Sequence, residues 1–266
     1  MIRDITLGQY YPADSVLHRL DPRVKLAGTL LYVISLFLFQ SYTGYIVATV
    51  FLVSMIIISR VPFTFMIRGL RAVMILLLFT AVLNVFLTPG RELVSFWKFT
   101  ITIEGAKMAG FMILRLTYLI IGSSIMTLTT TPSNLTDGLE KGLGWMKIMK
   151  IPVHEIAMMM SIALTFIPVL LEETDKIMKA QQSRGADFES GNIFRRVKAM
   201  VPILVPLFVS AFRRANDLAI AMESRCYRGG DGRTKLHPLR YEARDFIAYA
   251  ILAVYIACIV AVGFFI

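Results

Sequence analysis

The chain has 266 residues, of which 56% are hydrophobic and only 17% are charged. Soluble domains are about one-quarter charged, so this composition excludes a disordered chain and argues against an ordinary soluble enzyme. The 28 Lys and Arg outnumber the 18 Asp and Glu, which gives a formal net charge of +10. Because a basic chain that is also strongly apolar is typical of membrane proteins whose cations gather on one side, we predict an integral membrane protein.

Five stretches are apolar enough to be predicted as transmembrane helices. A bilayer core of about 30 Å takes about 20 helical residues, and fewer when flanking side chains reach the interface. In chain order, the predicted spans are Leu26–Phe39, Tyr45–Ile58, Ala72–Leu87, Met108–Thr130 and Phe246–Ile266. Residues 88–107, between the third and fourth spans, are predicted to form a short β-like or interfacial loop on the outside.

The distribution of cations predicts the orientation. The segments 1–25, 59–71 and 131–245 fall on one side of an alternating topology and carry 24 Lys and Arg, against 3 on the other side. By the positive-inside rule, we expect a cytoplasmic N-terminus and an extracellular C-terminus. Arg115 is the one cation inside a predicted span, where it is costly. It is either a structural contact with Asn84 or a neighbouring carbonyl, or part of a substrate pathway.

Residues 131–245 form the longest stretch without a predicted span. A short helix is predicted from Thr131-Pro132-Ser133 to about Gly142, with Ser133 as its N-cap. Two long amphipathic helices are predicted at about 153–183 and 193–224, lying in or just under the membrane interface. The predicted fold is therefore an all-α polytopic membrane protein with about five transmembrane helices, two long amphipathic cytoplasmic helices and a shorter one. Its predicted parts are transmembrane helices in 1–130, a cytoplasmic helical domain in 131–245 and a final transmembrane helix in 246–266.

The two long predicted helices end in similar sequences. Ala180-Gln-Gln-Ser-Arg-Gly185 and Ala221-Met-Glu-Ser-Arg-Cys226 share Ala, Ser and Arg at equivalent positions. Ordinary C-terminal caps account for a basic residue followed by glycine, but such caps require no shared Ala-x-x-Ser-Arg. The repetition favours a second interpretation, in which Arg184 and Arg225 are docking points for two similar partners.

Three motifs together resemble the transmembrane coupling component (EcfT or CbiQ type) of energy-coupling factor (ECF) transporters, the bacterial and archaeal importers of vitamins and metal ions. Leu17–Lys25 (LHRLDPRVK) resembles the family's entry into its first span, and Ser183–Phe188 and Ala221–Arg225 resemble its two arginine motifs. The resemblance covers essentially the full chain. The family more often has Gly at the position of Cys226, so the departure concerns the cap geometry after Arg225.

The resemblance implies a non-catalytic subunit of the cell membrane that joins two ABC-type ATPase subunits to a small substrate-binding membrane subunit (S component). By resemblance, each arginine enters a groove on one ATPase, and recognition of the substrate belongs to another subunit. The implied ATPase-docking residues are Ser183, Arg184, Gly185, Ser224, Arg225 and Cys226. The methionines of the same helices are either contacts for the S component, because methionine repacks readily, or internal core: Met158, Met159, Met160, Met200 and Met222.

The sequence offers little for other chemistry. It contains no GxxxxGK[ST] phosphate-binding loop, and His154-Glu155 is not followed by the second histidine of a zinc protease motif, because residue 158 is Met. We therefore expect no cofactor, no metal site and no nucleic-acid partner. The alternative function is a self-sufficient secondary transporter or channel with a cytoplasmic regulatory domain, which the scarcity of intramembrane charge disfavours. A membrane-bound enzyme is disfavoured by the lack of a catalytic constellation.

Overall fold

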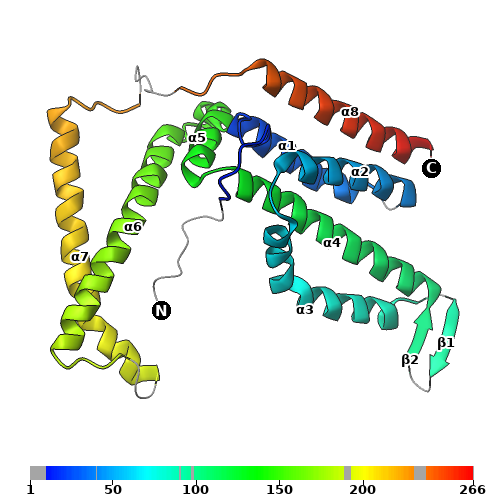
Figure 1. Cartoon of the computed structure of the whole chain (residues 1–266), viewed down its shortest axis with the longest axis horizontal. Helices are drawn as coiled ribbons and strands as arrows, with labels where there is room; N and C mark the ends of the chain where they lie inside the picture. Colours follow the sequence, from blue (N-terminus) through cyan, green and yellow to red (C-terminus); the bar gives the residue numbers. More distant parts are fainter. Residues whose placement is uncertain are drawn as a thin grey trace. The chain divides into compact units, whose positions relative to one another are not determined.

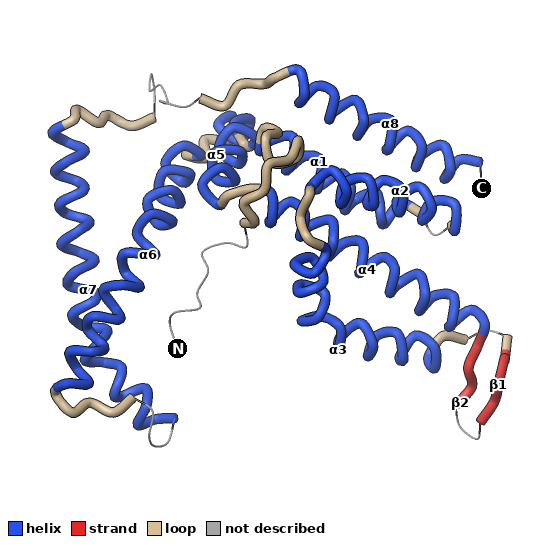
Figure 2. The backbone as a smooth tube through the Cα atoms, in the orientation of Figure 1, coloured by secondary structure: helices blue, strands red, loops and turns tan. Residues whose placement is uncertain are grey.

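The computed structural model describes residues 10–39, 41–89, 91–96, 99–188, 193–230 and 238–265. The helices are α1 (Pro22–Leu38), α2 (Tyr42–Ser59), α3 (Phe63–Leu87), α4 (Ile103–Thr129), α5 (Pro132–Gly142), α6 (Val153–Ser183), α7 (Ile193–Ser224) and α8 (Ala243–Phe265), with a short 3-10 helix η1 at Gly144–Met149 (Figure 1). Strands β1 (Glu92–Phe96) and β2 (Phe99–Thr102) form an antiparallel hairpin (Figure 2). The protein is thus an all-α polytopic membrane protein, as predicted, and the hairpin falls in the segment predicted to be β-like.

Four helices in the described part of the chain are long and apolar enough to cross a membrane. They are Tyr42–Ser59, Ile103–Thr129, Val153–Ser183 and Ala243–Gly263. The two segments of α3, Phe63–Arg71 and Val73–Leu87, add a fifth candidate if the bent pair is one span. The predicted number of about five spans is therefore confirmed.

The set of candidate spans differs from the prediction at α1 and α6. With 17 residues, α1 is only about 26 Å long, because Pro22 begins it and the backbone becomes extended at Phe39. By contrast, α6 qualifies because Glu155 is the only charged residue in its first 18 positions, and its other charges begin at Glu172. Charge crowded into one half of a long helix leaves the other half apolar enough for a bilayer.

The described chain divides into two compact units. The first, called here the membrane unit, contains α1 to α5, the hairpin and α8, and the second, called the helix-pair unit, contains η1, α6 and α7.

The N-cap of α5 differs from the prediction, because the Thr131 hydroxyl accepts a bond from the Asn134 N–H at 3.3 Å. Ser133 therefore lies inside the first turn of α5 rather than capping it.

Aromatic side chains and small residues form the core of the membrane unit. The ring of Phe51 on α2 stacks on Tyr255 of α8 with ring centroids 4.2 Å apart, and Tyr32 of α1 contacts both rings at centroid distances of 5.8 and 6.1 Å. Gly122 of α4 faces Tyr32 so closely that a Cβ there would collide with the ring. Since helices in a membrane associate by close packing, a small residue opposite a large one lets α1 and α4 approach.

A buried carboxylate joins the two ends of the membrane unit. Asp245 is 2% exposed, and its Oδ2 accepts a bond of 2.8 Å from the Glu242 N–H at the start of α8. The Oδ1 of the same side chain accepts a bond of 2.9 Å from the Asp21 N–H at the start of α1. One side chain therefore satisfies a backbone donor at two helix N-termini, where such donors lack partners within the helix.

The motif Leu17–Lys25 surrounds this junction. Asp21 caps α1 by accepting a bond of 2.9 Å from the Arg23 N–H. The buried Lys25 ammonium donates to the carbonyl oxygens of His18, at 3.2 Å, and Thr129, at 2.9 Å, which ties α1 to the end of α4. The motif thus acts as the point where α1, α4 and α8 are held together.

We expect Asp245→Ala to destabilise the protein by about 2–3 kcal/mol, because it removes a cap and leaves a buried N–H of Asp21 without an acceptor. For a chain of this size, the midpoint of thermal unfolding should fall by about 5 °C or more. The measurement is thermal unfolding of the purified protein in detergent.

The matched control for this prediction is Asp14→Ala. The Asp14 side chain is 82% exposed and pairs with Arg19 at 2.9 Å, and exposed pairs of this kind contribute little. Equal unfolding temperatures for the Asp245 and Asp14 variants would show that the junction does not stabilise the fold.

Candidate docking site at the ends of the two long helices

The helices α6 and α7 pack against each other in the helix-pair unit. A terminal guanidinium nitrogen of Arg214 on α7 donates to Glu173 Oε2 on α6 at 3.3 Å. Closer to the end of α6, the side-chain amide of Gln181 donates to the Pro202 carbonyl at 3.4 Å. Because contacts further along α6 meet residues earlier in α7, the helices are antiparallel, and their C-terminal ends lie at opposite ends of the pair (Figure 1).

The C-terminal end of α6 is a left-handed cap. Gly185 has a φ of +86°, and its N–H donates to the Gln182 carbonyl at 2.9 Å. The Ala186 N–H donates to the Gln181 carbonyl at 3.0 Å. These two bonds define a Schellman motif, which satisfies the last carbonyls of the helix and turns the chain sharply after Arg184.

The C-terminal end of α7 repeats the same geometry bond for bond. The Cys226 N–H donates to the Glu223 carbonyl at 2.9 Å, and the Tyr227 N–H donates to the Met222 carbonyl at 3.0 Å. Cys226 occupies the left-handed position with a φ of +56°. Non-glycine residues pay a steric cost of about 1–2 kcal/mol in this conformation, yet the chain adopts it here. The departure from glycine therefore leaves the cap geometry after Arg225 intact.

Both motifs are displayed on the surface of the helix-pair unit. The six predicted docking residues are all exposed: Ser183, Arg184, Gly185, Ser224, Arg225 and Cys226. The hydroxyls of Ser183 and Ser224 each donate back into their own helix at 3.0 Å. Within the described residues, neither arginine side chain makes a hydrogen bond or an ion pair, so both guanidinium groups are available to a partner.

The ion pair of Glu173 with Arg214 was not singled out by the sequence. Its two residues precede the two arginine motifs by the same number of positions. Glu173 lies 11 residues before Arg184, and Arg214 lies 11 residues before Arg225. The two helices therefore touch at equivalent positions of the repeated ends, and each arginine lies the same number of residues beyond this contact. The sequence contains the equal spacing, but only the structure shows that Glu173 and Arg214 are in contact.

The methionines predicted to contact a partner divide into two groups. Met159, Met160 and Met200 are exposed, at 59%, 42% and 57%, whereas Met158 and Met222 are half-buried. As expected from the amphipathic pattern of residues 193–224, an apolar face runs along α7, and it is exposed. Its large members recur at helical spacing: Val197, Val201, Leu204, Phe208 and Phe212.

The sequence left two roles open for Arg115, a structural contact or a place in a substrate pathway. The structure supports the structural contact. A terminal guanidinium nitrogen donates to the Phe39 carbonyl at 3.3 Å, and the guanidinium lies 5.4 Å from the ring centroid of Phe37. It therefore covers the C-terminal end of α1, where backbone carbonyls lack helical partners. Asn84, the other predicted contact, donates instead to the Thr80 carbonyl at 2.8 Å.

These features define a multi-pass membrane protein that carries a repeated arginine motif on an antiparallel helix pair. A family model described as CbiQ, cobalt transport protein, matches residues 13–236. The energy-coupling factor transporter transmembrane protein EcfT of Clostridium kluyveri is 56% identical over 261 residues, covering 97% of this chain and 96% of that protein. EcfT proteins of Thermosediminibacter oceani and Bacillus subtilis are 52% and 47% identical, over 95% and 92% of this chain and 97% and 93% of their own lengths.

The chain belongs to the CbiQ family, and the resemblance found in the sequence is confirmed. It is a membrane-spanning component of an energy-coupling factor transporter.

The two left-handed positions allow a reciprocal test of the caps. We expect Cys226→Gly to stabilise the end of α7 by about 1 kcal/mol and Gly185→Ala to destabilise the end of α6 by a similar amount. A steric clash does not contribute to the effect of Gly185→Ala, because a Cβ at this position would have no neighbour within 4 Å. Amide hydrogen exchange at Tyr227 should slow in the first variant, and exchange at Ala186 should quicken in the second. Unchanged exchange at both amides would contradict the cap geometry.

Proposed function

We propose that the protein is the non-catalytic coupling subunit of its transporter, linking ATP binding and hydrolysis by two ABC-type ATPase subunits to a substrate-binding membrane subunit for uptake of a vitamin or metal ion. The observation that carries this proposal is the pair of helix ends that share one cap geometry. Arg184 and Arg225 leave their helices in the same cap geometry, are exposed, and lie at opposite ends of one helix pair.

The arginines suit docking on a protein partner. A guanidinium is always charged and offers five donors in a rigid fork, so it can bind carboxylates and exposed carbonyls of a groove. Ser183, Gly185, Ser224 and Cys226 are small neighbours that let each helix end approach the partner closely. The left-handed turn supports this, because it directs the following chain away from the arginine.

The separation of the two ends favours two partners rather than one. Each arginine lies 11 residues beyond the contact of Glu173 with Arg214, which is about 16 Å along its helix. An antiparallel pair thus places the arginines up to about 30 Å apart, the diameter of a small domain. Two similar ATPase subunits, one at each end, fit this spacing and the repetition of the motif.

Such a pair of helices can transmit motion. If ATP draws the two ATPase subunits together, both helix ends must move, and the contact of Glu173 with Arg214 makes the two helices respond as a pair. The side chains of this pair are 28% and 38% exposed, so the ion pair is a modest contact that can break and re-form as the helices move. We infer that the helices act as levers.

The exposed apolar surface of the same helices is the proposed contact for the S component. Met159, Met160 and Met200 are exposed, and the apolar face of α7 extends this surface. Exposed apolar area of this extent on a helix pair favours a protein or lipid partner. Methionine side chains repack around different shapes, which suits a surface that accepts several S components.

The proposed topology places the N-terminus in the cytoplasm, the C-terminus outside, and residues 131–245 as the cytoplasmic coupling-helix domain of a cell-membrane protein. The composition of α6 refines this proposal. Its apolar first half meets the membrane, and its charged second half carries Arg184 into the cytoplasm. The contact of Arg115 with Phe39 also weakens the alternative of a secondary transporter, because the guanidinium inside α4 is occupied in holding α1.

Charge reversal at the two arginines tests the ATPase contact. We expect Arg184→Glu and Arg225→Glu each to weaken ATPase binding by about 30-fold or more, and the double variant to abolish association and transport, since loss of a buried charged contact typically costs about 2–5 kcal/mol. Co-purification from membranes and substrate uptake are the measurements. The matched control is Arg213→Glu, an exposed arginine of α7 outside both motifs.

Insertion into the membrane should be unchanged in all of these variants. Normal uptake in the double variant would refute the docking proposal, and equal losses with Arg213→Glu would show that bulk charge rather than the motif matters.

A substitution at Met200 tests the S-component contact separately. Met200→Glu should lower recovery of the S component by about tenfold or more while ATPase subunits still co-purify, because a carboxylate would be buried without a partner. Met200→Leu, which keeps the apolar surface, should behave as the original protein. Full recovery of the S component with Met200→Glu would exclude this methionine from the interface.

A further inference from the structure

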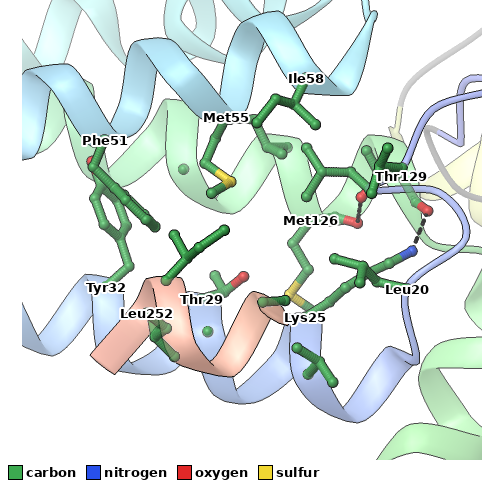
Figure 3. Close-up of a pocket in the computed structure, with 18 of the residues that line it drawn as sticks. Leu20, Lys25, Thr29, Tyr32, Phe51, Met55, Ile58, Met126, Thr129 and Leu252 are labelled. Carbon is green, nitrogen blue, oxygen red and sulfur yellow. Dashed lines mark hydrogen bonds between the residues drawn. The ribbon is translucent and has the colours of Figure 1, made fainter. Parts of the chain in front are cut away.

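An apolar cavity lies inside the membrane unit, between α1, α2, α4 and α8 (Figure 3). Its volume is about 180 Å³, which exceeds the roughly 150 Å³ of an engineered protein cavity that binds benzene. Its walls include Tyr32, Phe51, Met55, Met126 and Leu252. Since buried water needs two to four polar partners, walls of this kind favour an apolar occupant.

The cavity is charged at one end only. Among its lining residues two are charged, and both are cations: Lys25, in the first turn of α1, and Arg244, in the first turn of α8. Tyr32 and Leu252 lie two turns further along the same helices, about 10–12 Å deeper. Because α1 and α8 both begin at the junction of Asp21 with Asp245, both cations line the end of the cavity at which these two helices begin.

Both cations retain hydrogen-bond donors. The Lys25 ammonium has three N–H groups and donates to two carbonyls, those of His18 and Thr129. A terminal nitrogen of Arg244 contacts Glu242 Oε2 at 2.7 Å, whereas its buried Nε has no acceptor among the described residues. A phosphate oxygen is the kind of acceptor that such charged donors bind most strongly.

We propose that this cavity binds one acyl chain of an anionic phospholipid, whose phosphate group contacts Lys25 and Arg244. Phospholipids always surround a chain that spans a membrane. Their charged headgroup matches the charged end of the cavity, and their acyl chain matches its apolar walls. The occupant would also contact Leu17 and Leu20, which line the same cavity, and so hold the Leu17–Lys25 motif against α2 and α8. The site needs only that the chain spans a membrane, and it is independent of the proposed coupling function.

Photolabelling with a lipid probe tests the acyl-chain site. The full-length protein is placed in phosphatidylcholine vesicles that contain a small fraction of phosphatidylglycerol with a photoactivatable diazirine in its acyl chain. Peptide mapping should find the label near Met55, Met126 and Leu252. Gly28→Phe should reduce this labelling about tenfold, because Gly28 lines the cavity and a Cβ there lies 4.0 Å from Leu252.

The matched control is Gly110→Phe, the same substitution at an exposed position of α4 where a Cβ has no neighbour within 4 Å. It should leave the labelling unchanged. Ala248→Phe, from the wall formed by α8, is the second variant that fills the cavity, in case Gly28→Phe does not fold. Undiminished labelling in a folded variant that fills the cavity would overturn the site.

The headgroup contact has its own test. Labelling of the original protein should be several-fold stronger with the phosphatidylglycerol probe than with a phosphatidylcholine probe that carries the same diazirine. Arg244→Gln should remove this preference, whereas Arg240→Gln, an exposed arginine four residues earlier that does not line the cavity, should keep it. Equal labelling of the original protein by both probes would overturn the contact with an anionic headgroup.

Discussion

The membrane unit depends on one buried carboxylate. Asp245 accepts hydrogen bonds from the backbone at the start of α8 and at the start of α1, two helices that are 224 positions apart along the chain at this contact. Asp21 and Lys25 extend the junction to α4. Burying this much charge is costly unless every partner is in place, so the junction fixes one arrangement of the three helices. The cavity assigned to lipid opens between these same helices.

The helix-pair unit follows a different constraint, the repetition of one helix end. The two caps have the same hydrogen-bond pattern although one uses Gly185 and the other Cys226. A strained residue held in the left-handed region indicates that the turn itself is required. Because α6 and α7 are antiparallel and Glu173 contacts Arg214, the repeated caps lie at opposite ends of the pair. A sequence repeat is thereby converted into two separated, exposed helix ends of the same geometry.

Much of the fold and of the candidate site could be predicted because it rests on local pattern. The length of their apolar stretches allowed α2, α4 and α8 to be predicted as spans. Alternating threonine and isoleucine residues beside aromatic residues allowed the segment of the hairpin to be predicted as β-like. It was harder to predict whether α1 and α6 are long and apolar enough to span. Apolar content can be read from the sequence, whereas the length of a helix also depends on residues such as Pro22 that begin or end it. The Ser-Arg motifs were readable as a repeat, but the partners of Arg115 and Arg214 come from other helices and have no local signal.

The sequence by itself determined the class of protein, the approximate number of spans and the two arginine ends, because hydrophobicity and helix caps are properties of adjacent residues. Only the tertiary structure decided what those residues meet. It joined Asp245 to Asp21 and Arg115 to Phe39, and it brought Glu173 and Arg214 together so that the repeated ends point apart. Such contacts depend on how helices pack, and packing depends on the shapes of side chains distant in sequence.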